Sequence, residues 1–181
     1  MVREIVKYGS QVLRQPCAPV TQIDPSVKAL VRDLFDSMGA AEGVGLAAPQ
    51  LGVLRRVVVV DVSRQHPELL PISLINPRIV SAEGREMAEE GCLSFPDMYG
   101  QVPRHTKVSI EALDINGKQF TVEAEGFYAR ALQHELDHLD GKLFIDYLSP
   151  LKRQLIRGRL KVLKKEGERW DLEHPAALSG Y

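Results

Sequence analysis

The chain has 181 residues, of which 44% are hydrophobic and 26% are charged, and its formal net charge is -1. This composition excludes disordered and fibrous proteins, and the charge balance gives no overall preference for nucleic acid or for a membrane surface. A chain of this length forms one domain that buries roughly 70% of its unfolded surface. We therefore expect a single domain over residues 1–181.

The cysteine count and the N-terminus indicate the compartment. Only Cys17 and Cys92 are present, too few for a disulfide framework, which favours a reduced, cytoplasmic setting. The N-terminus lacks the apolar stretch of a signal peptide, and the longest aliphatic run, 57–60, is too short to span a bilayer. We expect no membrane segment.

The first predicted element is a helix over residues 25–40. Asp24 followed by Pro25 is typical of a helix start, because aspartate caps free amides and proline suits the first helical position. Apolar residues follow at helical spacing: Val27, Leu30, Val31, Leu34, Phe35 and Met38. Glycines at 43 and 45 end this region, and a short extended segment over 46–49 follows.

Strands are predicted in the middle of the chain. The valine-rich segment 56–62 predicts a buried strand, and 74–79 predicts another, with prolines at its edges. Apolar residues alternate from 107 to 122 around Asn116-Gly117. This pair adopts the positive φ angles of a tight turn, so the segment predicts a hairpin.

Two helices complete the prediction. Segment 127–139 has no proline or glycine and carries regularly spaced apolar residues, which predicts a central helix. Ser149-Pro150 starts a last helix that ends near Lys165, within a basic segment 150–168 that is followed by a tail, 169–181. The expected class is α+β: antiparallel strands packed around the central helix, with an N-terminal and a C-terminal helix.

The strongest local signal lies in the central helix, where His134-Glu135-Leu136-Asp137-His138 occurs. Residues four apart share one helix face, so both imidazoles can reach one metal ion, and Glu135 lies beside them where it can accept a proton from water. A lone histidine is more often structural, but chance seldom supplies both histidines and the glutamate. The pattern predicts a metal site.

The third ligand has several candidates. A catalytic zinc centre usually takes three protein ligands and leaves the fourth position for water. A metzincin arrangement fails because Phe144 stands where a third histidine is needed. Glu166 and Glu168 have the separation of a gluzincin ligand but lie in a basic helix that faces solvent. Cys92 offers a soft thiolate, although a free cysteine is more often a small buried hydrophobe.

Three segments together resemble the peptide deformylase family, of the bacterial type. They are GVGLAAPQ at 43–50, EGCLS at 90–94 and QHELDH at 133–138. They stand in the family's order, and the similarity continues from 139 to 144 and covers nearly the whole domain. The resemblance implies the peptide deformylase fold and a cytoplasmic bacterial enzyme that hydrolyses the N-formyl group on the initiator methionine of nascent peptides, releasing formate.

The resemblance also implies the metal centre. Cys92, His134 and His138 would hold a divalent ion, usually Fe2+ in this family, although Zn2+, Ni2+ or Co2+ can substitute. Ligand chemistry alone would favour zinc. The ion would bring the pKa of water down to about 7, and Glu135 would take the proton and deliver it to the leaving amine.

Further residues would bind substrate. By resemblance, the Gln50 side chain and the backbone N–H of Leu93 would stabilise the oxyanion. The backbone at Val44, Gly45 and Gly91 would hydrogen-bond an extended peptide as an added strand would.

The methionine side chain needs an apolar pocket, for which we expect Val44, Phe127, Ala131 and one face of His134. Arg130 departs from the family pattern, since an aliphatic residue is common there. Two interpretations stay open: its guanidinium reaches over the pocket mouth towards substrate carbonyls, or it binds an acidic neighbour such as Glu90.

Asp137 is expected to support the metal site rather than to ligate the ion, because it lies inside the metal motif. Arg104 is the partner that we expect to hold it in place.

The C-terminal helix has two interpretations. Segment 152–169 holds eight basic and two acidic residues. Such a run is usually a solvated helix face, but it also suits docking on ribosomal RNA near the nascent chain. We expect the protein to be a monomer.

Two other functions compete with the deformylase assignment. One is a metallopeptidase that uses the same helix motif, against which Cys92 in its motif argues. The other is a structural zinc module of the Cys2His2 type, in which Cys17 joins Cys92 and the two histidines.

Overall fold

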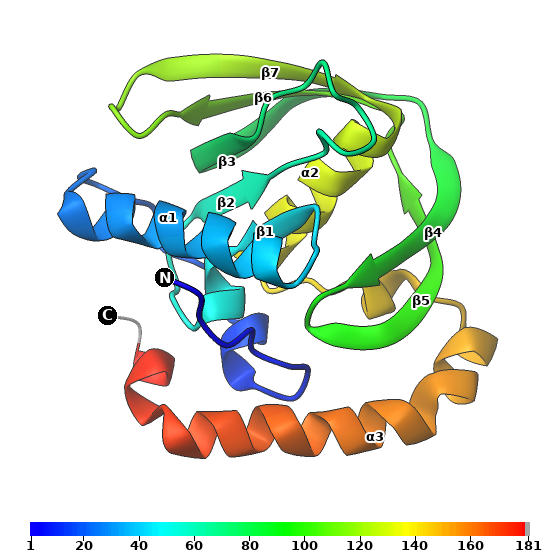
Figure 1. Cartoon of the computed structure of the whole chain (residues 1–181). Coiled ribbons are helices and arrows are strands. Elements are labelled where there is room, and N and C mark those ends of the chain that lie inside the picture. Colours follow the sequence, from blue (N-terminus) through cyan, green and yellow to red (C-terminus); the bar gives the residue numbers. More distant parts are fainter. Residues whose placement is uncertain (180–181) are drawn as a thin grey trace.

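Three α-helices and seven strands form the part of the chain that the computed structural model describes, residues 1–179 (Figure 1). The helices are α1 (Pro25–Ala40), α2 (Gly126–Leu139) and α3 (Pro150–Glu173). The strands are β1 (Gly45–Ala47), β2 (Val57–Val60), β3 (Ile72–Glu83), β4 (Glu86–Cys92), β5 (Phe95–Arg104), β6 (Lys107–Leu113) and β7 (Gln119–Glu125). Short 3-10 helices span 11–14, 48–51, 144–147 and 175–179. Among residues 1–179, no helix has both the length and the apolar character that crossing a membrane requires.

The strands form two antiparallel sheets around α2. One has the order β1-β2-β3-β6-β7, and the other is the pair β4-β5. The central helix packs against β1, β2, β6 and β7, while α1 covers β1 and β2 (Figure 1). Two hydrophobic clusters result, one around α2 and one beneath α1. The predicted α+β class, with antiparallel strands around a central helix, is confirmed.

The first helix has its predicted bounds. Its start depends on Asp24, whose carboxylate accepts a hydrogen bond from the backbone amide of Val27 at 3.0 Å. Of the apolar residues that predicted the helix, five are buried and Phe35 is half-buried; the buried ones are Val27, Leu30, Val31, Leu34 and Met38. Capping and periodicity are both local properties, which explains the agreement.

The hairpin is confirmed as β6 and β7, but its loop is wider than the predicted two-residue turn. Only Gly117 in this loop has a positive φ, of 80°. The Asp114 carboxylate instead accepts hydrogen bonds from the backbone amides of Asn116 and Lys118, at 2.8 and 2.9 Å. A side chain therefore organises the turn in addition to the glycine.

Other strand bounds differ from the prediction. β2 is shorter than 56–62. β3 extends beyond 74–79 at both ends, and its pairing with β6 continues through two register shifts, one of them around Pro77. Asn76 has a φ of 52° at this irregularity, and its side-chain amide pairs with the backbone of Val20. The extended segment predicted at 46–49 is β1 followed by a 3-10 turn.

The C-terminal helix was predicted too short. It was expected to end near Lys165, but α3 continues to Glu173, just before Pro175, so much of the expected tail is helical. Its last turns are fixed by packing, since Asp171 is buried and its carboxylate accepts a hydrogen bond from the Ser10 hydroxyl at 2.5 Å. No local sequence signal reports this long-range contact.

The N-terminal segment joins two parts of the site. The backbone amide of Val6 donates to the carbonyl of Gln50 at 2.9 Å, and that of Tyr8 donates to the carbonyl of Ser94 at 3.0 Å. α3 runs across this segment (Figure 1), and any side chain at Gly167 would overlap the Tyr8 carbonyl oxygen. The segment is thus held between α3 and the site.

Candidate metal centre

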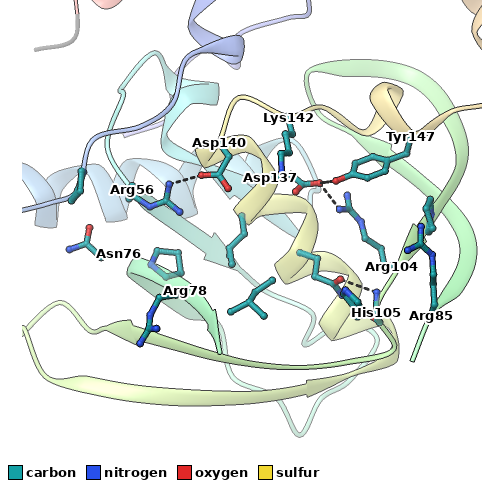
Figure 2. A pocket seen from close by; sticks show the side chains of 16 residues that line it. Arg56, Asn76, Arg78, Arg85, Arg104, His105, Asp137, Asp140, Lys142 and Tyr147 are labelled. Atoms are coloured by element: carbon teal, nitrogen blue, oxygen red, sulfur yellow. Dashed lines mark hydrogen bonds and ion pairs between the residues drawn. The ribbon is translucent and has the colours of Figure 1, made fainter. Parts of the chain in front are cut away.

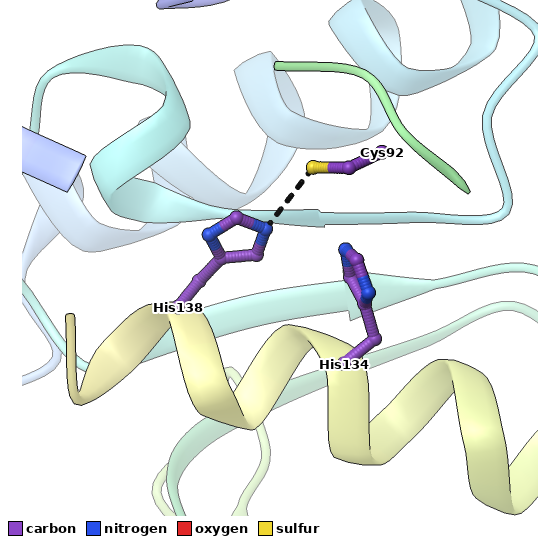
Figure 3. Close-up of side chains that lie close together, drawn as sticks. All are labelled: Cys92, His134 and His138. Atoms are coloured by element: carbon purple, nitrogen blue, oxygen red, sulfur yellow. Dashed lines mark hydrogen bonds between the residues drawn. The ribbon is translucent and has the colours of Figure 1, made fainter. Parts of the chain in front are cut away.

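Three donor side chains from two elements meet beside α2 (Figure 3). His134 and His138 stand one turn apart on this helix, and Cys92 ends β4. The Cys92 sulfur lies 3.3 Å from His138 Nε2, and the candidate ligand atoms of the three residues all lie within 4.8 Å of one another. The two imidazole centroids are 5.0 Å apart. The predicted set of one cysteine and two histidines is therefore a spatial cluster.

The donor set suits a divalent transition ion. A thiolate and two imidazoles are ligands that such ions prefer, and three protein ligands leave a position for solvent or substrate. His138 Nδ1 is buried and lacks a hydrogen-bond partner among the described residues. Burial lowers the pKa of His138 well below its usual value, which favours the neutral imidazole, the form that binds a metal.

The alternative ligand sets lack structural support. The cluster of possible ligands within residues 1–179 contains neither Cys17 nor the two glutamates of α3, Glu166 and Glu168. Cys17 is buried elsewhere, its backbone amide donates to Leu139, and burial raises the pKa of its thiol to about 12. Both glutamates are exposed. The two competing ligand sets, the Cys2His2 module and the gluzincin arrangement, therefore do not form among these residues.

Glu135 points into the site with one carboxylate oxygen free. Its side chain is buried, and Oε2 has no hydrogen-bond partner among the described residues. Burial raises the pKa of this carboxyl to about 7. Gly45 of β1 permits the arrangement, because a Cβ there would lie 2.8 Å from the Glu135 carboxyl carbon. A carboxylate held beside the metal cluster can accept and return a proton.

Gln50 is oriented towards the same point. Its side-chain oxygen accepts from the backbone amide of Ala47 at 2.9 Å, which fixes which end of the amide faces the site. Its Nε2 donates to the Ser94 hydroxyl at 3.1 Å and to the Cys92 sulfur at 3.5 Å. The amide is thus a buried donor next to the cluster, as an oxyanion-stabilising group must be.

Glu90 is the main site residue whose role the sequence did not reveal. Its buried carboxylate accepts a hydrogen bond from His134 Nδ1 at 2.9 Å, which leaves Nε2 of that ring to face the cluster. It also pairs with Arg104, at 2.8 and 3.1 Å. Burial opposes ionisation, but the bonds from His134 and Arg104 lower the pKa of Glu90 to about 2. The acidic residue before Gly91 was the available signal.

The predicted pairing of Asp137 with Arg104 is confirmed. Arg104 Nη1 lies 2.5 Å from the Asp137 carboxylate, which also accepts from the Tyr147 hydroxyl at 2.8 Å. Asp137 therefore contacts His134 indirectly, through Arg104 and Glu90. Gln133 adds a second link to this region, since its amide bonds both backbone groups of His105 at 2.9 Å. This role of Gln133 was also missed.

Arg130 makes the second of its two predicted contacts. Its guanidinium lies 3.0 Å from the Glu90 carboxylate and donates to the carbonyls of Val102 and Glu86, at 2.7 and 2.9 Å. The side chain is buried, so its charge is used within the protein. Arg130 also lines the cavity described next.

A cavity of about 690 Å³ opens onto the cluster. Cys92, His134 and Glu135 line it. The walls contain all of the expected substrate and oxyanion residues: Val44, Gly45, Gln50, Gly91, Leu93, Phe127, Arg130 and Ala131. Phe127 is 41% exposed at the opening. The sequence thus predicted the residues of one continuous cavity.

Comparison with known proteins gives consistent results. A family model described as "Polypeptide deformylase" matches residues 2–154. A peptide deformylase of Acidobacterium capsulatum is 47% identical over 168 residues, covering 93% of this chain and 99% of its own. One of Thermodesulfovibrio yellowstonii is 45% identical over 163 residues, covering 90% and 99%.

Solved structures agree. The crystal structure of a peptide deformylase from Legionella pneumophila has a TM-score of 0.84 and 45% identity, over 91% of this chain and 96% of that one. The Thermus thermophilus enzyme has a TM-score of 0.85 and 38% identity, over 92% and 99%. The likeness extends over nearly the full length of both partners in each comparison.

Proposed function

The chain belongs to the polypeptide deformylase family and is a hydrolase that removes the N-formyl group from nascent peptides, and we propose that Cys92, His134 and His138 hold its metal ion. The observation that carries this proposal is the meeting of these three donors beside the free carboxylate oxygen of Glu135. We propose Fe2+ as the ion, with Zn2+, Ni2+ or Co2+ able to substitute. A divalent ion held there supplies a Lewis acid that makes hydroxide available at neutral pH.

The chain's own residues handle the proton and the developing charge. Glu135 takes the proton of the attacking water on its free oxygen and passes it to the departing amine, so the same carboxylate acts as base and then as acid. The Gln50 side-chain amide and the backbone N–H of Leu93 donate to the oxyanion. Removing one such donor typically costs about 2.7–4 kcal/mol of barrier.

The cavity walls position the peptide. The substrate backbone lies extended between β1 and β4 and hydrogen-bonds at Val44, Gly45 and Gly91. A side chain at Gly91 would lie 2.7 Å from the Tyr99 ring, so glycine keeps this strand close to its neighbour. The methionine side chain enters between Phe127 and Ala131. Arg130, whose guanidinium is engaged with Glu90, shapes the wall.

The test is anaerobic loading of the metal-free protein with each of the four ions, followed by measurement of formate release from formyl-Met-Ala. We expect one ion per chain and the highest turnover with Fe2+. An unblocked casein should remain intact, which separates this activity from a metallopeptidase. The Synechococcus elongatus structure is described as a complex with actinonin, so we expect inhibition by actinonin here as well. Absence of formate release with all four ions would refute the site assignment.

We also propose that α3 docks on ribosomal RNA. Its basic side chains are joined on the exposed surface by apolar ones, with Leu155 72% and Val162 65% exposed. Reversing the charges of Arg157 and Lys161 should abolish co-sedimentation with ribosomes at low salt. A matched reversal of Lys28 and Lys118 should have little effect. If the unaltered protein does not co-sediment at low salt, α3 is a solvated surface.

The remaining proposals concern assembly and location. We expect a monomer, which sedimentation velocity would test. We expect it in the bacterial cytoplasm, where formylated nascent peptides are made.

A further inference from the structure

A second cavity, of about 660 Å³, lies beside α2 (Figure 2). Successive helix residues are rotated by about 100°, which directs Gln133, Leu136 and Asp137 away from the side that carries the two metal-binding histidines. These three residues line the second cavity, together with residues of β3, β5 and the segment after α2. It is therefore separate from the catalytic cavity.

The lining of this cavity is strongly cationic. It contains two carboxylates, Asp137 and Asp140, and the cationic residues Arg56, Arg78, Arg85, Arg104 and Lys142. This excess contrasts with the rest of the molecule. Outside 152–169, the chain has fifteen basic and twenty-two acidic residues, and a third of those basic residues gather at this one cavity.

The cations differ in how far they are already neutralised. Arg104 is fully engaged, as described above. Arg56 lies 2.8 Å from Asp140, and Arg78 lies 2.6 Å from a carboxylate outside the cavity. Arg85 and Lys142 are exposed and have no ion-pair partner among residues 1–179. Charge is therefore available at the rim, while the base of the cavity is closed by ion pairs.

The exposed cations are spread around the cavity. Arg85 and Lys142, which lack an ion-pair partner, come from the turn between β3 and β4 and from the segment after α2. Arg78 comes from β3 and is 71% exposed although it is paired, so its ion pair lies at the surface. Figure 2 shows them on different sides of the opening. Separated cations suit a ligand with several anionic groups along its length better than a single phosphate. Arginine in particular binds phosphate oxygens in pairs.

The walls offer flat surfaces between these charges. His105 is exposed beside the cavity (Figure 2). Tyr147 also lines it, with one face of its ring covered by the Arg104 guanidinium at 4.9 Å, and so do Pro77 and Pro103. Aromatic rings are the surfaces on which nucleic-acid bases stack. We propose that this cavity binds single-stranded RNA, with Arg78, Arg85 and Lys142 contacting successive phosphates. The site lies apart from both the catalytic cavity and α3, so it goes beyond the proposed function.

The test measures binding of a fluorescein-labelled 12-nucleotide oligouridylate to the metal-loaded protein, by anisotropy at several KCl concentrations. The double variant R85E/K142E removes two phosphate contacts at the rim. We expect its Kd at 100 mM KCl to rise about tenfold and the slope of log K against log [KCl] to become shallower by about 1.4, since each contact to a single strand contributes about 0.7.

The control is K28E/K118E, which changes the net charge equally at exposed lysines of α1 and the β6–β7 loop. Its Kd should change less than twofold. Formate release from formyl-Met-Ala should be unaffected in both variants, which separates failure here from failure of the catalytic assignment. Equal weakening in both variants, no RNA binding by the unaltered protein at 50 mM KCl, or binding of pyrophosphate without RNA would each overturn the proposal.

Discussion

The two sides of α2 differ in how fully their polar side-chain atoms are hydrogen-bonded. On the metal side, Glu135 Oε2 and His138 Nδ1 are buried and lack partners among the described residues. On the other side, the side chains of Gln133, Asp137 and Arg104 each make two or more hydrogen bonds. Unpartnered buried polar atoms are costly, so they persist where function requires them free. We call the side of Gln133, Asp137 and Arg104 the saturated side, because its polar groups are hydrogen-bonded. It holds the metal side in place.

The largest effect on activity should come from changing the carboxylate of Glu135. Glu135→Gln keeps the size of the side chain but removes the proton acceptor, so we expect kcat/KM to fall by about 10²–10⁴-fold. Metal content, measured by elemental analysis, should stay at the level of the unaltered protein. Equal turnover by the variant would show that the unpartnered oxygen is incidental.

The two thiols extend the comparison to reactivity. Cys92 lines the catalytic cavity, whereas Cys17 is buried and its pKa is raised to about 12. At pH 8 only about one Cys17 in ten thousand is then a thiolate, the form that reacts. We expect iodoacetamide to modify Cys92 of metal-free protein at least about 100-fold faster than Cys17. Peptide mass spectrometry measures both rates, and similar rates in the folded protein would contradict the burial of Cys17.

The saturated side should affect metal retention more than chemistry. Asp137→Asn removes the charge that holds Arg104, and we expect metal affinity to fall by about 10-fold, at the lower end for such supporting residues. Tyr147→Phe is the matched control, because it removes the other hydrogen bond to Asp137 and keeps the charge. Competition with a chelator measures both. Loss of turnover in fully metal-loaded Asp137→Asn protein would place this side in the chemistry instead.

The smallest effect should be on stability, and it should come from an ion pair that belongs to neither side of α2. Arg14 lies 2.6 Å from Asp146, and both side chains are more than a third exposed. Burial opposes ionisation, but the bond from Arg14 lowers the pKa of Asp146. A lowered native pKa stabilises the fold above the pKa of the unfolded chain, and this stability disappears as pH falls through the native pKa.

We therefore expect Asp146→Asn to lower the free energy of unfolding at pH 7 by no more than about 1 kcal/mol. The difference from the unaltered protein should be smaller at about pH 3, which lies below the pKa of about 3.9 in the unfolded chain. Urea unfolding at the two pH values measures it, and a difference that is equally large at the acidic pH would show that the ion pair is not the cause.

Local signals account for most of what the sequence predicted correctly. Asp24-Pro25 and the spacing that follows define α1, and His134 to His138 define one face of α2, because cap and periodicity act within a few residues. Only the family resemblance predicted that Cys92 lies beside these two histidines. Considered by itself, a free cysteine is more often a small buried hydrophobe.

What the sequence missed depends on contacts between distant segments. The strands β4 and β5 carry charged and polar residues without clear alternation, and they form by pairing with each other. Glu90 acquires its role from Arg104, 14 positions away, and from His134, 44 positions away. Likewise α3 continues past Lys165 because its last turns dock on the N-terminal segment. Burial and pairing of this kind become visible only in three dimensions.

The path of α3 across the N-terminal segment has a practical consequence for mapping ribosome attachment. Residues 6 and 8 hydrogen-bond to Gln50 and to Ser94, in the turn after Cys92, and so link these two segments. α3 packs over residues 6 to 8 and holds them there. A chain cut after Pro150 would lose that cover, so reduced sedimentation or reduced turnover would report a loosened active centre as readily as a missing docking surface. Point reversals of charge on an intact α3 keep the two apart.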